Sequence, residues 1–140
     1  MINYSNQKIS FPPIRKATVD LLRAAKRKNM IHSMVEMDIS RARTELRRIK
    51  KEKGHYISFT GYIIRCVARV VGDNRHMHAY RNRRGQLVLF DEVDVSTTIE
   101  RRIGGRSEVV AMIIRGADRK PAADISAEIR EESSRAAEEA

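Results

Sequence analysis

Histidine and cysteine are the residues of this chain that could bind a soft metal ion. The sequence holds four histidines and one cysteine, namely His32, His55, His76, His78 and Cys66. Imidazole and thiolate groups suit zinc and copper, but such a site needs three or four converging ligands. His76 and His78 would share one face of an extended segment, and no third histidine or cysteine stands nearby. The spacing predicts solvated histidines and no metal site.

The sequence carries no common motif of covalent catalysis or nucleotide binding. It lacks a Gly-x-Ser-x-Gly elbow, a glycine-rich phosphate loop ending in Lys-Ser or Lys-Thr, and a serine or cysteine at a recognisable motif spacing from a histidine. Cys66 falls on the apolar face of a predicted helix, where a thiol is typically a small buried hydrophobic group. We therefore expect Cys66 to be buried and unreactive.

A basic run between positions 39 and 53 could contact a polyanion. Seven side chains crowd the outer face of a predicted helix: Arg41, Arg43, Arg47, Arg48, Lys50, Lys51 and Lys53. Phosphates of a nucleic acid or of a cofactor such as coenzyme A would both favour this face. Aromatic residues make up only 5% of the chain, no Trp is present to stack on bases, and Glu45 and Glu52 interrupt the run. These features favour a solvated helix face over specific nucleic-acid recognition.

Length and composition indicate one folded domain. The 140 residues are 41% hydrophobic and 33% charged, close to the values of folded globular chains. The net charge is +10, and it is uneven, because residues 1–56 carry fourteen basic against five acidic groups whereas residues 121–140 carry two against six. No apolar run approaches the about 20 residues of a membrane-spanning helix, and one cysteine cannot form an internal disulfide. We expect a soluble, cytoplasmic protein that does not enter a membrane.

Four segments have the apolar spacing of amphipathic helices: about residues 13–28, 39–53, 58–72 and 124–140. Asp38, Ser58 and Asp124 are predicted to cap the second, third and fourth helices, because short oxygen-bearing side chains accept hydrogen bonds from the first turn. Gly54 suits the left-handed position after the second helix. The third helix is so rich in apolar residues that we expect it to be largely buried. Residues 1–10 are polar and predicted to be loose.

After residue 72 the spacing of apolar residues changes from one typical of helices to one typical of strands. Residues 82–85 predict a turn between two short apolar segments, which indicates a hairpin. Residues 93–99 alternate between apolar and polar, Gly104 and Gly105 suit a turn, and residues 109–114 are almost continuously apolar, as in a strand buried on both faces. A helix-rich first half joined to a strand-rich second half predicts an α+β chain with a mixed or antiparallel sheet.

Several short segments between positions 11 and 136 follow one another in a recognisable order. They are Pro13-Ile14-Arg15-Lys16, Ile31-His32, Glu36-Met37-Asp38-Ile39-Ser40, the segment from Ile57 to Ala68, Phe90-Asp91-Glu92-Val93-Asp94-Val95-Ser96, the segment from Ile114 to Lys120, and the segment from Asp124 to Ile129. In this order they resemble the N-terminal part of the catalytic domain of the dihydrolipoamide acyltransferase subunits of 2-oxo acid dehydrogenase complexes. The resemblance implies that residues 11–140 form part of a chloramphenicol acetyltransferase-like fold.

The resemblance also implies a function and two supporting residues. Members of the family transfer an acyl group from a lipoyl thioester to coenzyme A, so both are substrates and no tightly bound cofactor is implied. The family assembles as trimers, which implies a homo-oligomer here and a lipoyl domain as an acyl-carrying partner. Arg15 resembles an arginine that pairs with the aspartate of the catalytic motif, and His32 matches a non-catalytic position near the channel. The alternatives are an exposed helix arginine and a purely structural histidine.

The sequence departs from the family where the chemistry occurs. The family's general base lies in a His-x-x-x-Asp-Gly motif, which is absent from these 140 residues. Segments 75–78 and 104–108 differ from the family pattern, which puts the substrate channel in doubt, and Glu132 replaces a leucine. We expect that no catalytic residue is in this chain, that it is inactive alone, and that the natural protein continues past Ala140.

Three functions therefore stay open. The ordered strings favour an acyltransferase-family domain that needs further residues for catalysis. A non-catalytic assembly or partner-binding domain of the same fold is the alternative, and a basic nucleic-acid-binding module is the least favoured.

Overall fold

The computed structural model describes residues 8, 10, 11, 13–26, 31–103 and 106–135. The chain separates into two units, residues 1–36 and residues 37–140. The first unit contains helix α1, Pro13–Ala25, followed by residues 31–36, which have no regular secondary structure. The predicted start of this helix is confirmed, whereas its predicted end at residue 28 and most of the loose segment 1–10 lie outside the described residues.

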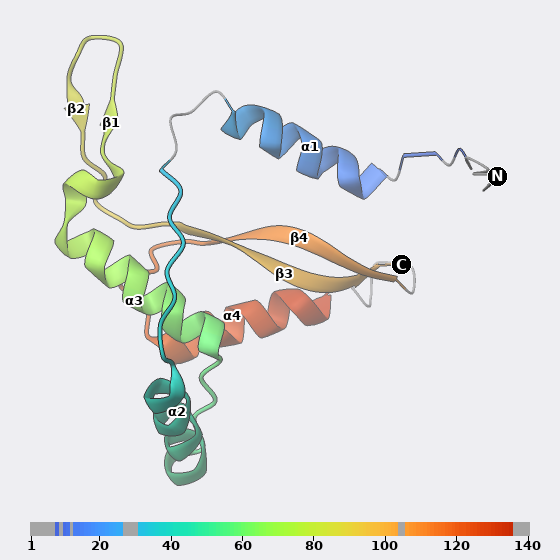
Figure 1. The fold of residues 1–140 in the computed structure, drawn as a ribbon, viewed down its shortest axis with the longest axis vertical. Helices are drawn as coiled ribbons and strands as arrows, with labels where there is room; N and C mark the ends of the chain where they lie inside the picture. The colour runs from blue at the N-terminus through green and yellow to red at the C-terminus, as the bar shows by residue number, and fades with distance from the viewer. Residues whose placement is uncertain (1–7, 9, 12, 27–30, 104–105, 136–140) are drawn as a thin grey trace, which may run out of the picture. The chain divides into compact units, whose positions relative to one another are not determined.

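The second unit combines helices with two antiparallel pairs of strands (Figure 1). Its elements are α2 (Ser40–Lys53), α3 (Phe59–Asp73), the 3₁₀ helix η1 (Arg75–His78), β1 (Tyr80–Arg81), β2 (Leu87–Val88), β3 (Val95–Ile103), β4 (Arg106–Ile114) and α4 (Ala122–Arg135). Strand β1 pairs with β2 and β3 pairs with β4. The predicted α+β class and the predicted turn at residues 82–85 are confirmed, whereas the turn predicted at Gly104 and Gly105 lies outside the described residues. Within the described ranges, no helix has the length and apolar character needed to cross a membrane.

Local hydrogen bonds explain where most of the helices begin and end. Ser58 caps α3 as predicted, because its hydroxyl accepts from the Gly61 amide at 3.0 Å. Gly54 follows α2 at φ 66°, the left-handed conformation that glycine tolerates best. The predicted cap Asp38 is displaced by one residue: it lies before the N-cap and accepts from the Ser40 amide at 2.8 Å. Asp124 lies within the first turn of α4 and does not precede it.

Helices α3 and α4 meet at a hydrogen-bonded contact of two serines and a glycine. The Ser126 hydroxyl, which is buried, donates to the Ala122 carbonyl at 2.6 Å and accepts from the Ser58 amide at 3.0 Å and the Ser58 hydroxyl at 3.2 Å. A Cβ atom at position 61 would collide with the Ser126 hydroxyl oxygen, so only glycine permits this approach. The contact joins the start of α3 to the second turn of α4, which is far away in the sequence.

A small hydrophobic core lies beside this contact. It is built from Ile64 and Ala68 of α3, Ile114 and Ala117 at the end of β4, Ile125 of α4, and Val93. Helix α4 also packs on β3, so one face of the β3–β4 hairpin is covered. The start of β3, the end of β4 and the start of α4 therefore all pack against α3.

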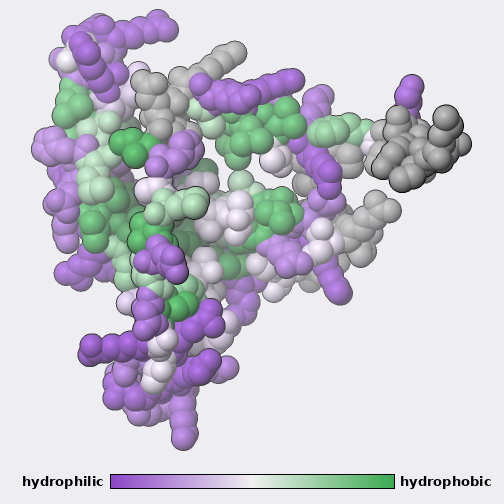
Figure 2. Space-filling view, viewed as in Figure 1, coloured by the Kyte–Doolittle hydropathy of each residue, from purple (hydrophilic) through white to green (hydrophobic). Residues whose placement is uncertain are grey.

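Two predictions of burial are wrong. The apolar segment 109–114 is not buried on both faces, because the side chains of Val109 and Ile113 are 65% and 51% exposed. Among the residues that the structure describes, β3 is the one partner strand of β4, and α4 covers only the face that holds Ile99 and Ile114. Helix α3 is likewise buried along one side, while Val67 and Val70 face solvent. Hydrophobic side chains accordingly reach the surface among the hydrophilic ones (Figure 2).

Residues 91–94 and 115–119 are clamped together where β3 begins and β4 ends. The Ala117 amide donates to the Val93 carbonyl at 2.8 Å, and the Val93 amide donates to Asp118 Oδ1 at 2.9 Å. Asp94 Oδ1 accepts from the Gly116 amide at 2.9 Å, and its other oxygen pairs with Arg115. The Gly116 hydrogen bond, followed by Arg115, lowers the pKa of Asp94 below its usual 3.8. Two of the strings that resemble the family thus contact each other in space.

Replacing Ser126 by alanine tests the contact between α3 and α4. Ser126→Ala leaves the half-buried Ser58 amide and hydroxyl without their partner, so we expect the free energy of unfolding to fall by about 1–3 kcal/mol. Ser134→Ala is the matched control, because Ser134 makes the same bond to the carbonyl four residues earlier but is exposed. It should change stability by less than about 0.5 kcal/mol. Urea titrations followed by circular dichroism measure both, and equal losses would contradict the assigned role.

The clamp predicts a specific dependence of stability on pH. Because folding lowers the pKa of Asp94, its stabilising effect is complete above about pH 4 and is lost as the pH falls through the lowered value. Asp94→Asn should cost about 1 kcal/mol at neutral pH, since the carboxylate is partly exposed and screened, and should flatten the loss of stability below about pH 4. Asp73→Asn, which removes the exposed Asp73–Arg69 pair, is the control. A variant profile parallel to that of the wild type would refute this.

Candidate functional site

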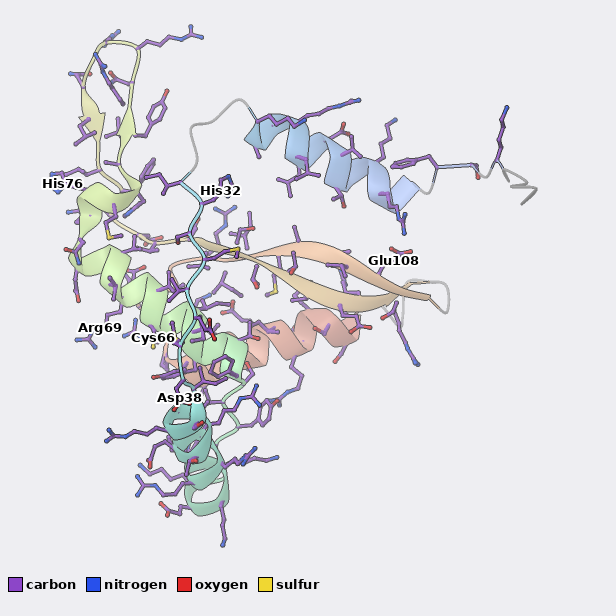
Figure 3. The ribbon with its side chains drawn as sticks, in the orientation of Figure 1. His32, Asp38, Cys66, Arg69, His76 and Glu108 are labelled. Carbon is purple, nitrogen blue, oxygen red and sulfur yellow. The ribbon has the colours of Figure 1, made fainter. Side chains whose placement is uncertain are left out.

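The two residues predicted to support an active site belong to the first unit. Arg15 lies in the second position after the start of α1 and is exposed. His32 lies in the irregular segment after α1, where it is exposed as well (Figure 3). Within the described ranges, neither side chain makes a hydrogen bond or an ion pair. Their roles are not tested by this geometry and stay predictions.

Cys66 is exposed, which corrects the prediction that it is a buried hydrophobic group. The buried side of α3 is defined by Gly61, Ile64 and Ala68, and Cys66 lies off this side of the helix (Figure 3). The thiol lies beside the Tyr62 hydroxyl one turn earlier, and this neighbour raises the pKa of Tyr62. The apolar spacing misled because it continues around α3 onto a face that no described element covers.

The two histidines of η1 have different surroundings. Because residues 75–78 form a 3₁₀ helix, the extended segment that would place His76 and His78 on one face does not form. His76 is exposed (Figure 3), whereas the His78 ring stacks on Phe90 with 5.8 Å between the ring centroids. Both ring nitrogens of His78 are buried without a hydrogen-bond partner, which corrects the prediction of a solvated histidine. Phe90 lies twelve residues away, so no local signal predicts this contact.

His78 lines a cleft of about 260 Å³ beside the C-terminal half of α3. Three arginines reach the cleft, and each already has a partner: Arg65 donates to the Asp118 carbonyl, Arg69 pairs with Asp73 at 3.9 Å, and Arg75 donates to the Phe90 carbonyl at 3.0 Å and pairs with Asp91. Three aspartates line the same cleft and balance the arginines: Asp73, Asp91 and Asp118. The cleft is therefore polar and nearly neutral, and its composition does not select an anion.

A second cavity, of about 380 Å³, lies between the β3–β4 hairpin and α4. Glu128, Glu131 and Glu132 line its helical wall. Glu132, which replaces the leucine of the family pattern, contacts Arg101 of β3 at 3.8 Å and Arg135 at 2.9 Å. A salt bridge thus occupies a position where the family pattern has an apolar contact.

The described residues place no cluster of metal-binding side chains in either cavity. None of their His, Cys, Asp and Glu side chains forms a group of three or more that could hold a metal ion. Asp38 has a lowered pKa, but the cause is the hydrogen bond from Ser40, and the side chain is an exposed helix-start residue. Of the segments that depart from the family pattern, residues 75–78 form η1, while Gly104 and Gly105 lie outside the described residues.

Comparison with known proteins identifies this arrangement. The family model of the 2-oxoacid dehydrogenases acyltransferase (catalytic domain) matches residues 3–140. A truncated catalytic core of the 2-oxoacid dehydrogenase multienzyme complex from Thermoplasma acidophilum is similar in structure, with a TM-score of 0.69 and 23% identity; the match covers 94% of this chain and 60% of that one. A search of curated proteins found no match.

Two further solved structures agree. A dihydrolipoamide acetyltransferase from Azotobacter vinelandii matches with a TM-score of 0.67 and 13% identity over 92% of this chain and 54% of its own. A probable dihydrolipoamide acetyltransferase from Listeria monocytogenes gives 0.66 and 20%, over 91% and 55%. This chain thus spans 54–60% of the length of these three structures. Together with the family match, they confirm the predicted resemblance and fold: the chain belongs to the 2-oxoacid dehydrogenase acyltransferase family and has the fold of its catalytic domain.

Proposed function

We propose that residues 11–140 form the N-terminal part of a catalytic domain that transfers an acyl group from a lipoyl thioester to coenzyme A. The observation that carries the proposal is the family match over residues 3–140. The clamp between residues 91–94 and 115–119 supports it, because these are two of the strings that resemble the family. Coenzyme A and the lipoyl thioester are then substrates, and no tightly bound cofactor is required.

The general base of this reaction must come from outside the 140 residues. Acyl transfer between thiols needs a group that removes the proton of the attacking thiol. The sequence contains no His-x-x-x-Asp-Gly motif, and His78, the histidine with free buried ring nitrogens, lies in a nearly neutral cleft beside α3. Arg15 is exposed and makes no ion pair in the described part of the chain, so its guanidinium is available to the aspartate of that motif. His32 is exposed in the same unit and would line the approach to the site.

The proposal includes assembly with copies of the same chain. The structures that this fold resembles include a multienzyme-complex core and the cubic core of a pyruvate dehydrogenase complex. Apolar side chains support an interface here, because Ile31 and Met34 are 98% exposed and Val109 and Ile113 are uncovered on β4. We therefore expect a homo-oligomer built from trimers. Its cytoplasmic location and a lipoyl domain as the acyl carrier are expectations from the family resemblance.

Acyl transfer by the natural protein tests the proposal. We expect the protein purified from its source to transfer acyl groups between coenzyme A and dihydrolipoamide, and the isolated 140 residues to show no transfer. In the natural protein, Arg15→Ala should lower the rate about tenfold or more, because a charge-assisted pair that positions the base is lost. Lys16→Ala is the control, since Lys16 is the adjacent exposed cation of α1.

The alternative function makes a different prediction for the same measurement. A natural protein that forms large assemblies in light scattering but transfers no acyl group is a non-catalytic assembly domain of the same fold. Equal effects of Arg15→Ala and Lys16→Ala would remove Arg15 from the site while leaving the acyltransferase activity in place.

A further inference from the structure

Helix α2 carries a concentration of positive charge that the contacts described above do not neutralise. The α2 basic surface is formed by Arg41, Arg43, Arg47, Arg48, Lys50, Lys51 and Lys53, against which stand only Glu45 and Glu52. The helix has fourteen residues, none of which is buried. Figure 1 shows α2 at one end of residues 37–140, and Figure 2 shows this end covered with hydrophilic side chains.

The contacts of α2 hold the helix with its charges outward. Its apolar stripe, Ala42, Leu46 and Ile49, is half-buried. Arg43 lies over the Phe59 ring at 5.5 Å, and Lys50 lies over the Tyr56 ring at 5.4 Å. Arg130 of α4 lies over the same Tyr56 ring at 4.4 Å, which adds another cation to this end. The aromatic rings that attach α2 are thus surrounded by positive charge.

Most of the cations on α2 have no internal partner. Among the described residues, the one ion pair of α2 joins Arg48 to Glu45 at 2.8 Å. Arg41, Arg47, Lys51 and Lys53 make no hydrogen bond or ion pair through their side chains there, and all four are exposed. The helix dipole favours positive charge only in the last turn of a helix, so it does not account for the positions of Arg41 and Arg47. These charges therefore fit an external anion.

The surface composition favours a nucleic acid over an acidic protein as that anion. Protein interfaces have an apolar centre, but α2 exposes no large hydrophobic side chain. A helix of fourteen residues is about 21 Å long and fits the major groove of a nucleic-acid duplex, where phosphates repeat along both edges. Scarcity of aromatic residues argues against stacking on bases, and it does not affect contacts to phosphates. We propose that the α2 basic surface binds the phosphate backbone of duplex DNA without sequence preference, an activity beyond the proposed acyl transfer.

Fluorescence anisotropy with labelled duplexes of about 20 base pairs and two unrelated sequences tests the proposal. With about four phosphate contacts, the logarithm of the binding constant should fall against the logarithm of salt concentration with a slope of about −3.6, or about 150-fold between about 50 and 200 mM. The triple variant Arg41→Gln, Arg47→Gln, Lys51→Gln should reduce the slope to about −1 and weaken binding at least about tenfold at low salt. Glutamine preserves helix propensity, and circular dichroism checks that α2 persists.

The matched control removes the same charge elsewhere. Arg81→Gln, Arg83→Gln, Arg84→Gln lowers the net charge by the same three units in the exposed β1–β2 hairpin, and it should keep the slope and affinity of the wild type. Equal losses in both triple variants would overturn the proposal, because binding would then follow net charge alone. Absence of binding at about 50 mM salt, or displacement of the DNA by polyglutamate at equal charge concentration, would also overturn it, the latter in favour of an acidic protein partner.

Discussion

The contact of Ser126 with Ser58 and Gly61 is the constraint on which the rest of the second unit depends. The Ser126 hydroxyl has one proton and two lone pairs, and the three hydrogen bonds described above use all of them. Because Gly61 has no side chain, α3 and α4 approach each other closely. Ile64 of α3 and Ile125 of α4 are therefore buried in the same hydrophobic core. Without this approach, the end of β4 would have no surface to pack against.

The core that results is small for the length of the chain, and this has consequences for assembly. Among the described residues only seven hydrophobic side chains are buried, whereas large apolar residues such as Ile31, Met34 and Val109 face solvent. Apolar area of this kind is typical of a surface that another polypeptide covers. The hydrogen-bonded clamp at residues 91–94 compensates locally, since it fixes the hairpin through backbone and carboxylate contacts that need little buried area.

Features that depend on neighbours in the sequence were predictable, and features that depend on distant residues were not. Ser58, Gly54 and the turn at Asn82 act within four residues, and Asn82 Oδ1 indeed accepts from the Arg84 and Gln86 amides. The prediction that Asp38 is the N-cap of α2 was wrong by one position, because an aspartate that accepts a hydrogen bond from the Ser40 amide looks like a helix cap in the sequence.

The errors at Cys66 and His78 have a common physical origin. Periodicity shows that a face is apolar, but it does not show whether another element covers it, so Cys66 was predicted to be buried. His78 was predicted to be solvated because its stacking partner Phe90 comes from the far side of the β1–β2 hairpin. The candidate site residues Arg15 and His32 came from the resemblance alone, since no local pattern marks an exposed arginine or histidine as functional.

The distribution of charge along the chain shows why α2 keeps its positive surface. The acidic C-terminal region suggests attraction to the basic N-terminal region, yet two of the four described acids of α4 pair elsewhere: Glu128 pairs with Lys120, and Glu132 contacts Arg101 and Arg135. The contact that α4 does make to this region is Arg130 over Tyr56, which adds a cation. Positive charge is therefore left at α2, while Glu128 and Glu132 are engaged with Lys120 before α4, with Arg101 of β3 and with Arg135 of α4 itself.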